Sequence, residues 1–136
     1  MFIPKKVKHR KWHKVAGTSG RVASRLTEID FGSFGLKALT GAWVTSRQIE
    51  AARRVIVRYI RKGGKMWIRI FPDKPVTIKG SEVPMGKGKG AVDHYVIDVK
   101  PGSVIIELDG VPSAEATEAL KMAGDKLPMK TRVIKK

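Results

Sequence analysis

The sequence contains no cysteine, and it has only 12 acidic residues against 28 lysines and arginines. Without cysteine, disulfide bonds, thiolate zinc sites and cysteine nucleophiles are excluded, so the composition does not indicate an oxidising compartment. No stretch reaches the roughly 18 apolar residues that a membrane-spanning helix needs, and no apolar run follows the first charges as in a signal peptide. We therefore expect a soluble, cytosolic protein that does not enter a membrane.

The positive charge is large and unevenly distributed. A formal net charge of +16 and a pI near 10.4 indicate a polyanionic partner, with nucleic acid favoured over an anionic membrane surface. Residues 1–25 contribute +8, residues 26–43 contribute −1, residues 44–92 contribute +9, and residues 93–136 are neutral. This distribution predicts one extended cationic surface in the first two thirds of the chain, with a nearly neutral packing unit behind it.

The length and the hydrophobic content predict one folded domain. The chain has 136 residues, of which 42% are hydrophobic, and it shows no internal repeat. Residues 1–25 lack apolar periodicity, so we expect a basic N-terminal arm that is ordered mainly by its partner. The single domain then covers residues 26–136, and its core begins near "FGSFGLKAL".

Residues 45–62 carry the pattern of an amphipathic helix. Thr45 and Gln48 form a capping box, and two glycines follow the segment. At about 100° per residue, one face is apolar. Its members are Ile49, Ala52, Ile56, Tyr59 and Ile60. The opposite face carries Arg47, Arg54, Arg58 and Arg61. Ion pairs with Glu50 are the simplest explanation of this charged face, but the planar fork of arginine also suits phosphate contact, which we favour.

The remaining segments predict strands and a second helix. Residues 65–71 are rich in strand-forming residues, whereas three prolines in residues 72–84 predict an irregular excursion and exclude a central strand. The segments 92–99 and 103–108 flank a turn at "KPG" and predict a hairpin. Ser113 is predicted to cap a second helix, and residues 129–134 to form a closing strand. The apolar stripe of this helix is Ala116, Ala119, Leu120, Ala123 and Leu127. The predicted fold is α+β, with two helices packed on a mixed or mainly antiparallel sheet and a long glycine-lysine loop within residues 72–91.

That loop contains "GKGKGA" at residues 86–91, which formally matches the dinucleotide-binding pattern G-x-G-x-x-G/A. The context does not fit, because prolines precede the loop and a strand pattern, not a helix, follows it. A solvated hairpin tip and an RNA-contacting tip remain the two other interpretations. Lysines on a flexible glycine backbone can approach phosphates from many angles, so we favour RNA contact.

Catalytic and metal chemistry have little support in the sequence. The three histidines are His9, His13 and His94, and neither they nor the carboxylates have a metal-binding spacing. We therefore expect no enzyme, no cofactor and no metal, and we assign His94 to a strand face. In the arm, Trp12 lies between two histidines and could stack on unpaired bases, which favours RNA over DNA. Three further aromatic residues could be stacking platforms or core, and core is the preferred interpretation. They are Trp43, Trp67 and Phe71.

Five blocks of sequence resemble, in the same order, the universal ribosomal protein family whose bacterial members are number sixteen of the large subunit. The blocks are "FGSFGLKAL", "RQIEAARR", "IRIFPDKPVT", "MGKGKG" and "KLPMKT". The resemblance implies a structural, non-enzymatic component of the large ribosomal subunit in the cytoplasm. It implies binding to 23S rRNA near the peptidyl-transferase region and the A-site tRNA cleft, late entry into subunit assembly, and a role in tRNA positioning. Implied partners are rRNA, A-site tRNA and neighbouring ribosomal proteins, without homo-oligomers.

The resemblance also implies site residues. The rRNA contacts would be Lys5, Lys6, Lys8, Arg10, Lys11, Arg47, Arg53, Arg54, Arg58, Arg61 and Lys74. The loop nearest the A site and tRNA would be Met85, Gly86, Lys87, Gly88, Lys89 and Gly90. The chain departs from the family at Pro84, where many members carry an arginine that some bacteria hydroxylate, so that modification is excluded here.

Two other functions are compatible with parts of the sequence. Composition alone allows a free regulatory or chaperone-like RNA-binding protein, which would be abundant in ribosome-free fractions. A nucleotide-dependent enzyme using residues 86–91 would show saturable binding of ATP or NAD. Because no transit peptide precedes "MFIPKK", we expect a bacterial rather than an organellar host.

Overall fold

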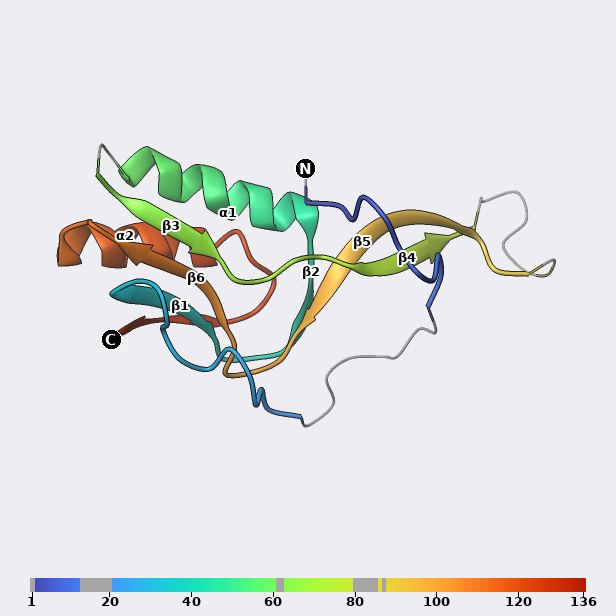
Figure 1. The fold of residues 1–136 in the computed structure, drawn as a ribbon, viewed down its shortest axis with the longest axis horizontal. Coiled ribbons are helices and arrows are strands. Elements are labelled where there is room, and N and C mark those ends of the chain that lie inside the picture. The colour runs from blue at the N-terminus through green and yellow to red at the C-terminus, as the bar shows by residue number, and fades with distance from the viewer. Residues whose placement is uncertain (1, 13–20, 61–62, 80–85, 87) are drawn as a thin grey trace.

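The computed structural model describes residues 2–12, 21–60, 63–79, 86 and 88–136 (Figure 1). This part of the chain forms two helices and seven strands. They are β1 Phe34–Ala38, β2 Ala42–Thr45, α1 Ser46–Tyr59, β3 Lys65–Ile68, β4 Lys74–Ile78, β5 Ala91–Val99, β6 Val104–Asp109, α2 Ser113–Gly124 and β7 Thr131–Lys135. The α+β class predicted from the sequence is confirmed.

The strands form two sheets rather than one. The larger sheet has the order β3-β6-β1-β7, and the smaller one has the order β2-β5-β4. Every strand pair that the structure describes is antiparallel. The smaller sheet extends away from the helices, and the described residues between β4 and β5 lie at the far end of the molecule from α2 and the C-terminus (Figure 1).

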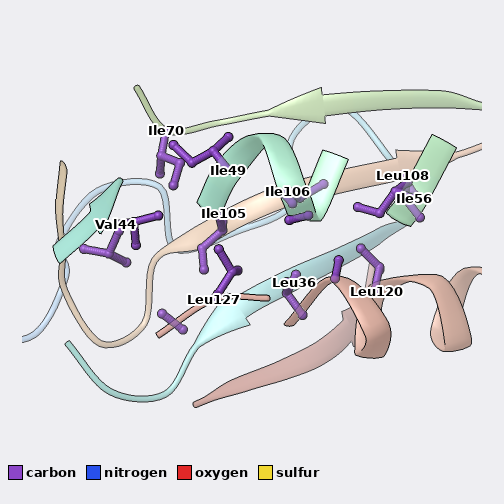
Figure 2. Packing of buried hydrophobic residues seen from close by; sticks show 14 of the residues in the cluster. Leu36, Val44, Ile49, Ile56, Ile70, Ile105, Ile106, Leu108, Leu120 and Leu127 are labelled. Atoms are coloured by element: carbon purple, nitrogen blue, oxygen red, sulfur yellow. The ribbon is translucent and has the colours of Figure 1, made fainter. Parts of the chain in front are cut away.

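The core lies between the two helices and the larger sheet (Figure 2). The helices pack on each other, and α2 also contacts β1 and β7. The fully buried residues that the three layers share include Leu36, Ile49, Ala52, Ile56, Ile106, Leu108, Ala116, Ala119, Leu120 and Ala123. Both predicted helical stripes therefore face the core, and Leu127 is buried just beyond the end of α2.

Helix α1 begins as predicted and ends earlier. The Thr45 side chain accepts a hydrogen bond from the backbone N–H of Gln48, whose side chain accepts one from the backbone N–H of Thr45. The helix ends at Tyr59 because Ile60 has an extended backbone with ψ at 110°. The predicted continuation to residue 62 is therefore wrong at its end. Neither α1 nor α2 is long and apolar enough to span a membrane, within the ranges described above.

The predicted hairpin of residues 92–108 is wrong, although its turn is present. The backbone N–H of Ser103 donates to the carbonyl of Lys100 at 3.2 Å, which closes a turn around "KPG". The two strands then diverge, because β5 pairs with β2 and β4 while β6 pairs with β1 and β3. The turn thus connects the two sheets.

Two smaller predictions also need correction. Residues 72–84 are not wholly irregular, because Lys74–Ile78 form β4 at the edge of the smaller sheet. Proline is compatible with an edge strand, and Pro75 is accommodated there. In α2, Pro112 occupies the N-cap without a capping side-chain bond, so Ser113 is the first helical residue and not the cap. The closing strand is confirmed as β7.

Candidate nucleic-acid interface

The outer face of α1 presents arginines to solvent. Arg47, Arg54 and Arg58 lie on this face, and we call these three residues the arginine face of α1. The opposite side of the same helix is buried through Ile49, Ala52 and Ile56. The amphipathic pattern of the sequence therefore orients the arginines away from the core, as predicted. Arg61, the fourth predicted member, lies outside the described residues.

Glu50 engages two of the arginines on this helix. Arg53 donates to both carboxylate oxygens, from Nε at 2.9 Å and from Nη2 at 2.5 Å, and Arg54 Nε donates to Oε1 at 3.2 Å. The hydrogen bond with Arg53 lowers the pKa of Glu50 to about 2, with a smaller contribution from Arg54. The side chain of Arg54 is still 72% exposed, whereas that of Arg53 is 30% exposed. Both arginines thus share an internal partner, and Arg53 is the less accessible of the two.

The N-terminal arm places its cations at the surface. Lys5, Lys6, Lys8 and Arg10 are exposed, and Lys11 is half-buried. Phe2 packs against the core, and the arm runs from beside the start of α1 across the smaller sheet toward the β4–β5 loop (Figure 1). Farther along, the backbone N–H of Ala23 donates to the carbonyl of Pro101 at 2.9 Å. The arm therefore has contacts with the domain at both of its described ends.

The described part of the β4–β5 loop depends on glycine. Gly86 and Gly88 have φ of +86° and +85°, a region that residues with a Cβ rarely adopt. The side chain of Lys79 donates to the carbonyl of Gly86. Gly88, Lys89 and the glycine at position 90 lead directly into β5 and not into a helix, so the dinucleotide-binding interpretation lacks its helix. Met85, Lys87 and Pro84 lie outside the described residues.

The arm and the loop contact each other. Lys11 Nζ donates to the carbonyl of Lys89 at 3.3 Å, and Lys89 Nζ donates to the carbonyl of Trp12. Two cationic segments that are 77 residues apart in sequence are thus joined by reciprocal side-chain to backbone bonds. Because a carbonyl acceptor carries no net charge, these bonds do not offset the charges of the two lysines, and the contact concentrates positive charge at this end of the molecule.

Aromatic residues lie beside this contact. Trp12, Trp43, Lys74 and Lys89 line a small cavity of about 50 Å³. Lys74 Nζ lies 4.5 Å from the centroid of the Trp43 ring, a cation–π geometry. Trp12 is 41% exposed, so its ring remains accessible to a stacking base.

The other aromatic residues divide between the two interpretations. Trp67 is half-buried and stacks on Phe31, with ring centroids 5.9 Å apart. Phe71 is 46% exposed, so its assignment to the core is wrong. His94 lies on β5 as predicted, and its Nδ1 lies 2.6 Å from Asp93 Oδ2. Within the described ranges, no three histidine or acidic side chains come together as a metal site would require.

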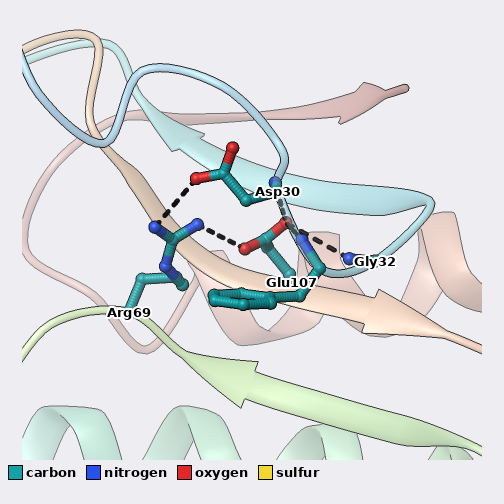
Figure 3. A network of polar contacts seen from close by, with 5 residues as sticks. Asp30, Gly32, Arg69 and Glu107 are labelled. Atoms are coloured by element: carbon teal, nitrogen blue, oxygen red, sulfur yellow. Dashed lines mark hydrogen bonds and ion pairs between the residues drawn. The ribbon is translucent and has the colours of Figure 1, made fainter.

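A buried polar network that sequence reasoning missed fixes the segment leading into β1 (Figure 3). Glu107 on β6 is fully buried, and its Oε1 accepts backbone N–H bonds from Asp30, Phe31 and Gly32 at 2.7, 3.0 and 3.3 Å. Its Oε2 accepts from Arg69 Nη1 at 2.6 Å. Burial raises the pKa of Glu107, but the bonds from Arg69 and the backbone outweigh it, so the pKa lies below its ordinary value. A glutamate within the apolar run "VIIEL" was the signal for this site.

Two similarities to known proteins cover almost the whole chain. The profile of a family described as Ribosomal protein L16p/L10e matches residues 4–134. The chain is also 54% identical over 134 residues to a protein of Phaeodactylum tricornutum (strain CCAP 1055/1) named "Large ribosomal subunit protein uL16c". That alignment covers 98% of this chain and 96% of the diatom protein. The family match includes the arm from residue 4, α1 and the segment between β4 and β5.

Proposed function

Because the chain belongs to the ribosomal protein L16p/L10e family, we propose that its exposed cations bind 23S rRNA beside the cleft that receives A-site tRNA. Family membership makes the protein a structural constituent of the large ribosomal subunit and not an enzyme. Its partners are rRNA and other ribosomal proteins. This excludes the nucleotide-dependent enzyme and disfavours the free RNA-binding protein.

The observation that carries the proposed rRNA contact is the junction of the arm and the β4–β5 loop. Lys11 and Lys89 hold the two segments together through carbonyl oxygens, and neither lysine forms an ion pair with an acid that the structure describes. Like charges repel, and such a junction is stabilised when phosphates lie next to it. The arrangement therefore supports an RNA contact at this end of the smaller sheet.

The arginine face of α1 supplies a second part of the same contact. Its guanidinium groups can donate two parallel hydrogen bonds to a phosphate, which fixes orientation as well as charge. Arg47 and Arg58 have no ion-pair partner among the residues with a described position. They are free to neutralise phosphates, and closely apposed RNA helices can then pack against each other.

The β4–β5 loop is the element proposed to reach the A-site and tRNA. Its described residues lie at the far end of the smaller sheet, away from the helical core (Figure 1). Its glycines leave the backbone without side-chain bulk, so Lys89 and its neighbour Lys87 can approach phosphates closely. A contact of this kind reads the backbone and not the sequence, which suits a site that receives many different tRNAs.

Assembly order and compartment follow from the same premises. A surface that joins an arm, a helix and a loop requires RNA segments that are already adjacent, which supports late entry into the subunit.

The high identity to the Phaeodactylum tricornutum protein named uL16c favours a plastid or other organellar ribosome over a bacterial or plain cytoplasmic one. Quantitative mass spectrometry of ribosomes from separated organelle and cytosol fractions tests this placement.

The loop is tested by Lys87→Ala combined with Lys89→Ala in reconstituted large subunits. We expect impaired A-site tRNA binding and translation, with an unchanged fold of the isolated protein. The matched control is Lys65→Ala with Lys100→Ala, which removes the same charge from two exposed positions outside the interface. Occupancy is measured by mass spectrometry, and unchanged tRNA binding in fully occupied subunits refutes the role of the loop.

A further inference from the structure

A groove separates α2 from β7, at the end of the molecule opposite the β4–β5 loop (Figure 1). Its volume is about 730 Å³, and we call it the α2–β7 groove. Val133 and the fully buried Leu36 lie on its strand side, while Thr117 and Lys121 line it from α2 and Asp125 lines it from the C-cap of that helix. These three residues are spaced by four, so they form one stripe along the helix.

The groove is closed at one end by a direct contact between helix and strand. A Cβ on Gly124 would lie 2.3 Å from the Thr131 side-chain oxygen, so only glycine permits this approach. Thr117 lies seven residues earlier on α2, which is roughly 10 Å along the helix axis. Lys135 lies at the other end of β7. The groove therefore runs from the contact at Gly124 toward Thr117 and Lys135.

The charge around the groove is positive, although residues 93–136 are neutral in total. Residues 93–120 hold six acids and one base, whereas residues 121–136 hold six bases and one acid, Asp125. Lys121, Arg132 and Lys135 line the groove. Neither Lys121 nor Arg132 forms an ion pair with a residue that the structure describes. Lys135 Nζ lies 5.8 Å from the centroid of the Phe34 ring. The nearly neutral packing unit expected from the sequence thus carries a cationic surface of its own.

The backbone of β7 adds hydrogen-bonding groups to the rim. Strand β7 is an edge strand, and β1 is its neighbour. The backbone N–H of Leu39 donates to the carbonyl of Lys130, and the backbone N–H of Lys136 donates to the carbonyl of Ser33. The even-numbered residues of this segment therefore direct their backbone N–H and C=O groups toward β1. Residues 131, 133 and 135 consequently direct their backbone groups away from the sheet. Lysine and arginine on an edge strand disfavour the addition of another protein strand. Their side chains and the outward-facing backbone N–H groups can instead donate hydrogen bonds to a phosphate.

We propose that the α2–β7 groove binds the sugar-phosphate backbone of a second rRNA segment, separate from the one at the arm, α1 and the loop. The proposal rests on the proposed function, because it assumes that the protein is surrounded by rRNA. Val133 offers a ribose an apolar contact, and Lys121 of α2 and Lys135 of β7 meet the phosphates on either side. With RNA at both ends of its long axis, the protein ties two rRNA segments together.

The test compares the double variant Lys121→Gln and Lys135→Gln with a charge-matched control, the double variant Lys65→Gln and Lys100→Gln. Binding to large subunits from which this protein has been washed is measured across a range of KCl concentrations. We expect the groove variant to bind about tenfold more weakly, with a salt slope that is lower by about 1.5, because each phosphate contact contributes about 0.7 to 0.9. Equal thermal unfolding midpoints for both variants show that the fold is intact.

A photoreactive benzoylphenylalanine at position 117 identifies the occupant of the groove. A crosslink to rRNA supports the proposal, whereas a crosslink to a ribosomal protein overturns it in favour of strand addition at β7. Equal affinity and equal salt slope for the groove variant and its control also overturn it, while the proposed function stands. If the unsubstituted protein itself fails to bind the washed subunits, both the proposed function and this inference fall.

Discussion

The replacement Glu107→Gln tests whether the buried carboxylate holds the segment before β1 in place. Glu107 accepts four hydrogen bonds, three from the backbone of residues 30–32 and one from Arg69 (Figure 3). Glutamine has nearly the same size but offers only one acceptor oxygen. The side-chain NH2 group of glutamine must therefore face either the backbone N–H groups or the guanidinium. Both of these are donors, so the NH2 group finds no acceptor there.

The expected loss can be worked out from the surroundings of the pair. Removing one partner from a buried ion pair costs about 3–5 kcal/mol, because the other charge is left uncompensated. Arg69 keeps a second partner, Asp30 Oδ2 at 3.1 Å, and its side chain is 11% exposed. We therefore expect Glu107→Gln to lower the free energy of unfolding by about 3 kcal/mol, the lower end of this range. At about 4 °C per kcal/mol for a chain of this length, the midpoint of thermal unfolding should fall by about 12 °C.

The loss should depend on pH in a definite direction. The pKa of Glu107 in the folded state lies below its ordinary value of 4.5. A carboxyl group of this kind stabilises the fold above its unfolded pKa, and this stabilisation disappears as the pH falls through the folded pKa. The difference in the free energy of unfolding between wild type and Glu107→Gln should thus be constant near neutral pH and shrink below pH 4.5.

Urea unfolding followed by circular dichroism measures this difference, and Glu118→Gln on the outer side of α2 is the matched control. The control should change the free energy of unfolding by less than about 0.5 kcal/mol. A loss below about 1 kcal/mol for Glu107→Gln at neutral pH would refute the reasoning, since it would equal one ordinary hydrogen bond. An unchanged difference at acidic pH would show that the charge of Glu107 contributes nothing.

Two further predictions concern α1. Thr45→Ala removes the N-terminal cap and should lower the free energy of unfolding by about 1 kcal/mol, measured by urea unfolding with Thr45→Ser as the control that keeps the hydroxyl. No loss would mean that the capping box is not maintained in solution. Glu50→Gln releases Arg53 and Arg54 from their shared carboxylate. The slope of log affinity for rRNA against log salt concentration should then steepen by the contribution of about one phosphate contact. An unchanged slope would place these arginines away from phosphates.

The sequence predicted what depends on residues close together in the chain. Helix α1, its capping box and its arginine face follow from a 3.6-residue period and a four-residue motif, because these interactions lie within one or two turns. The turn at "KPG" was predicted for the same reason. The charge of the arm follows from composition, and the five quoted blocks indicated the ribosomal family because they occur in the order that its members share.

The tertiary structure decided which distant segments meet. The strands on either side of the "KPG" turn pair with different sheets, since pairing depends on hydrogen bonds to β1, β2, β3 and β4 that no local pattern encodes. The junction of Lys11 with Lys89 joins residues 78 apart, and the network around Glu107 joins residues 38 to 77 apart. The positive α2–β7 groove was hidden by the neutral sum of residues 93–136. Composition counts charges along the chain, whereas folding places acids and bases of one segment on different surfaces.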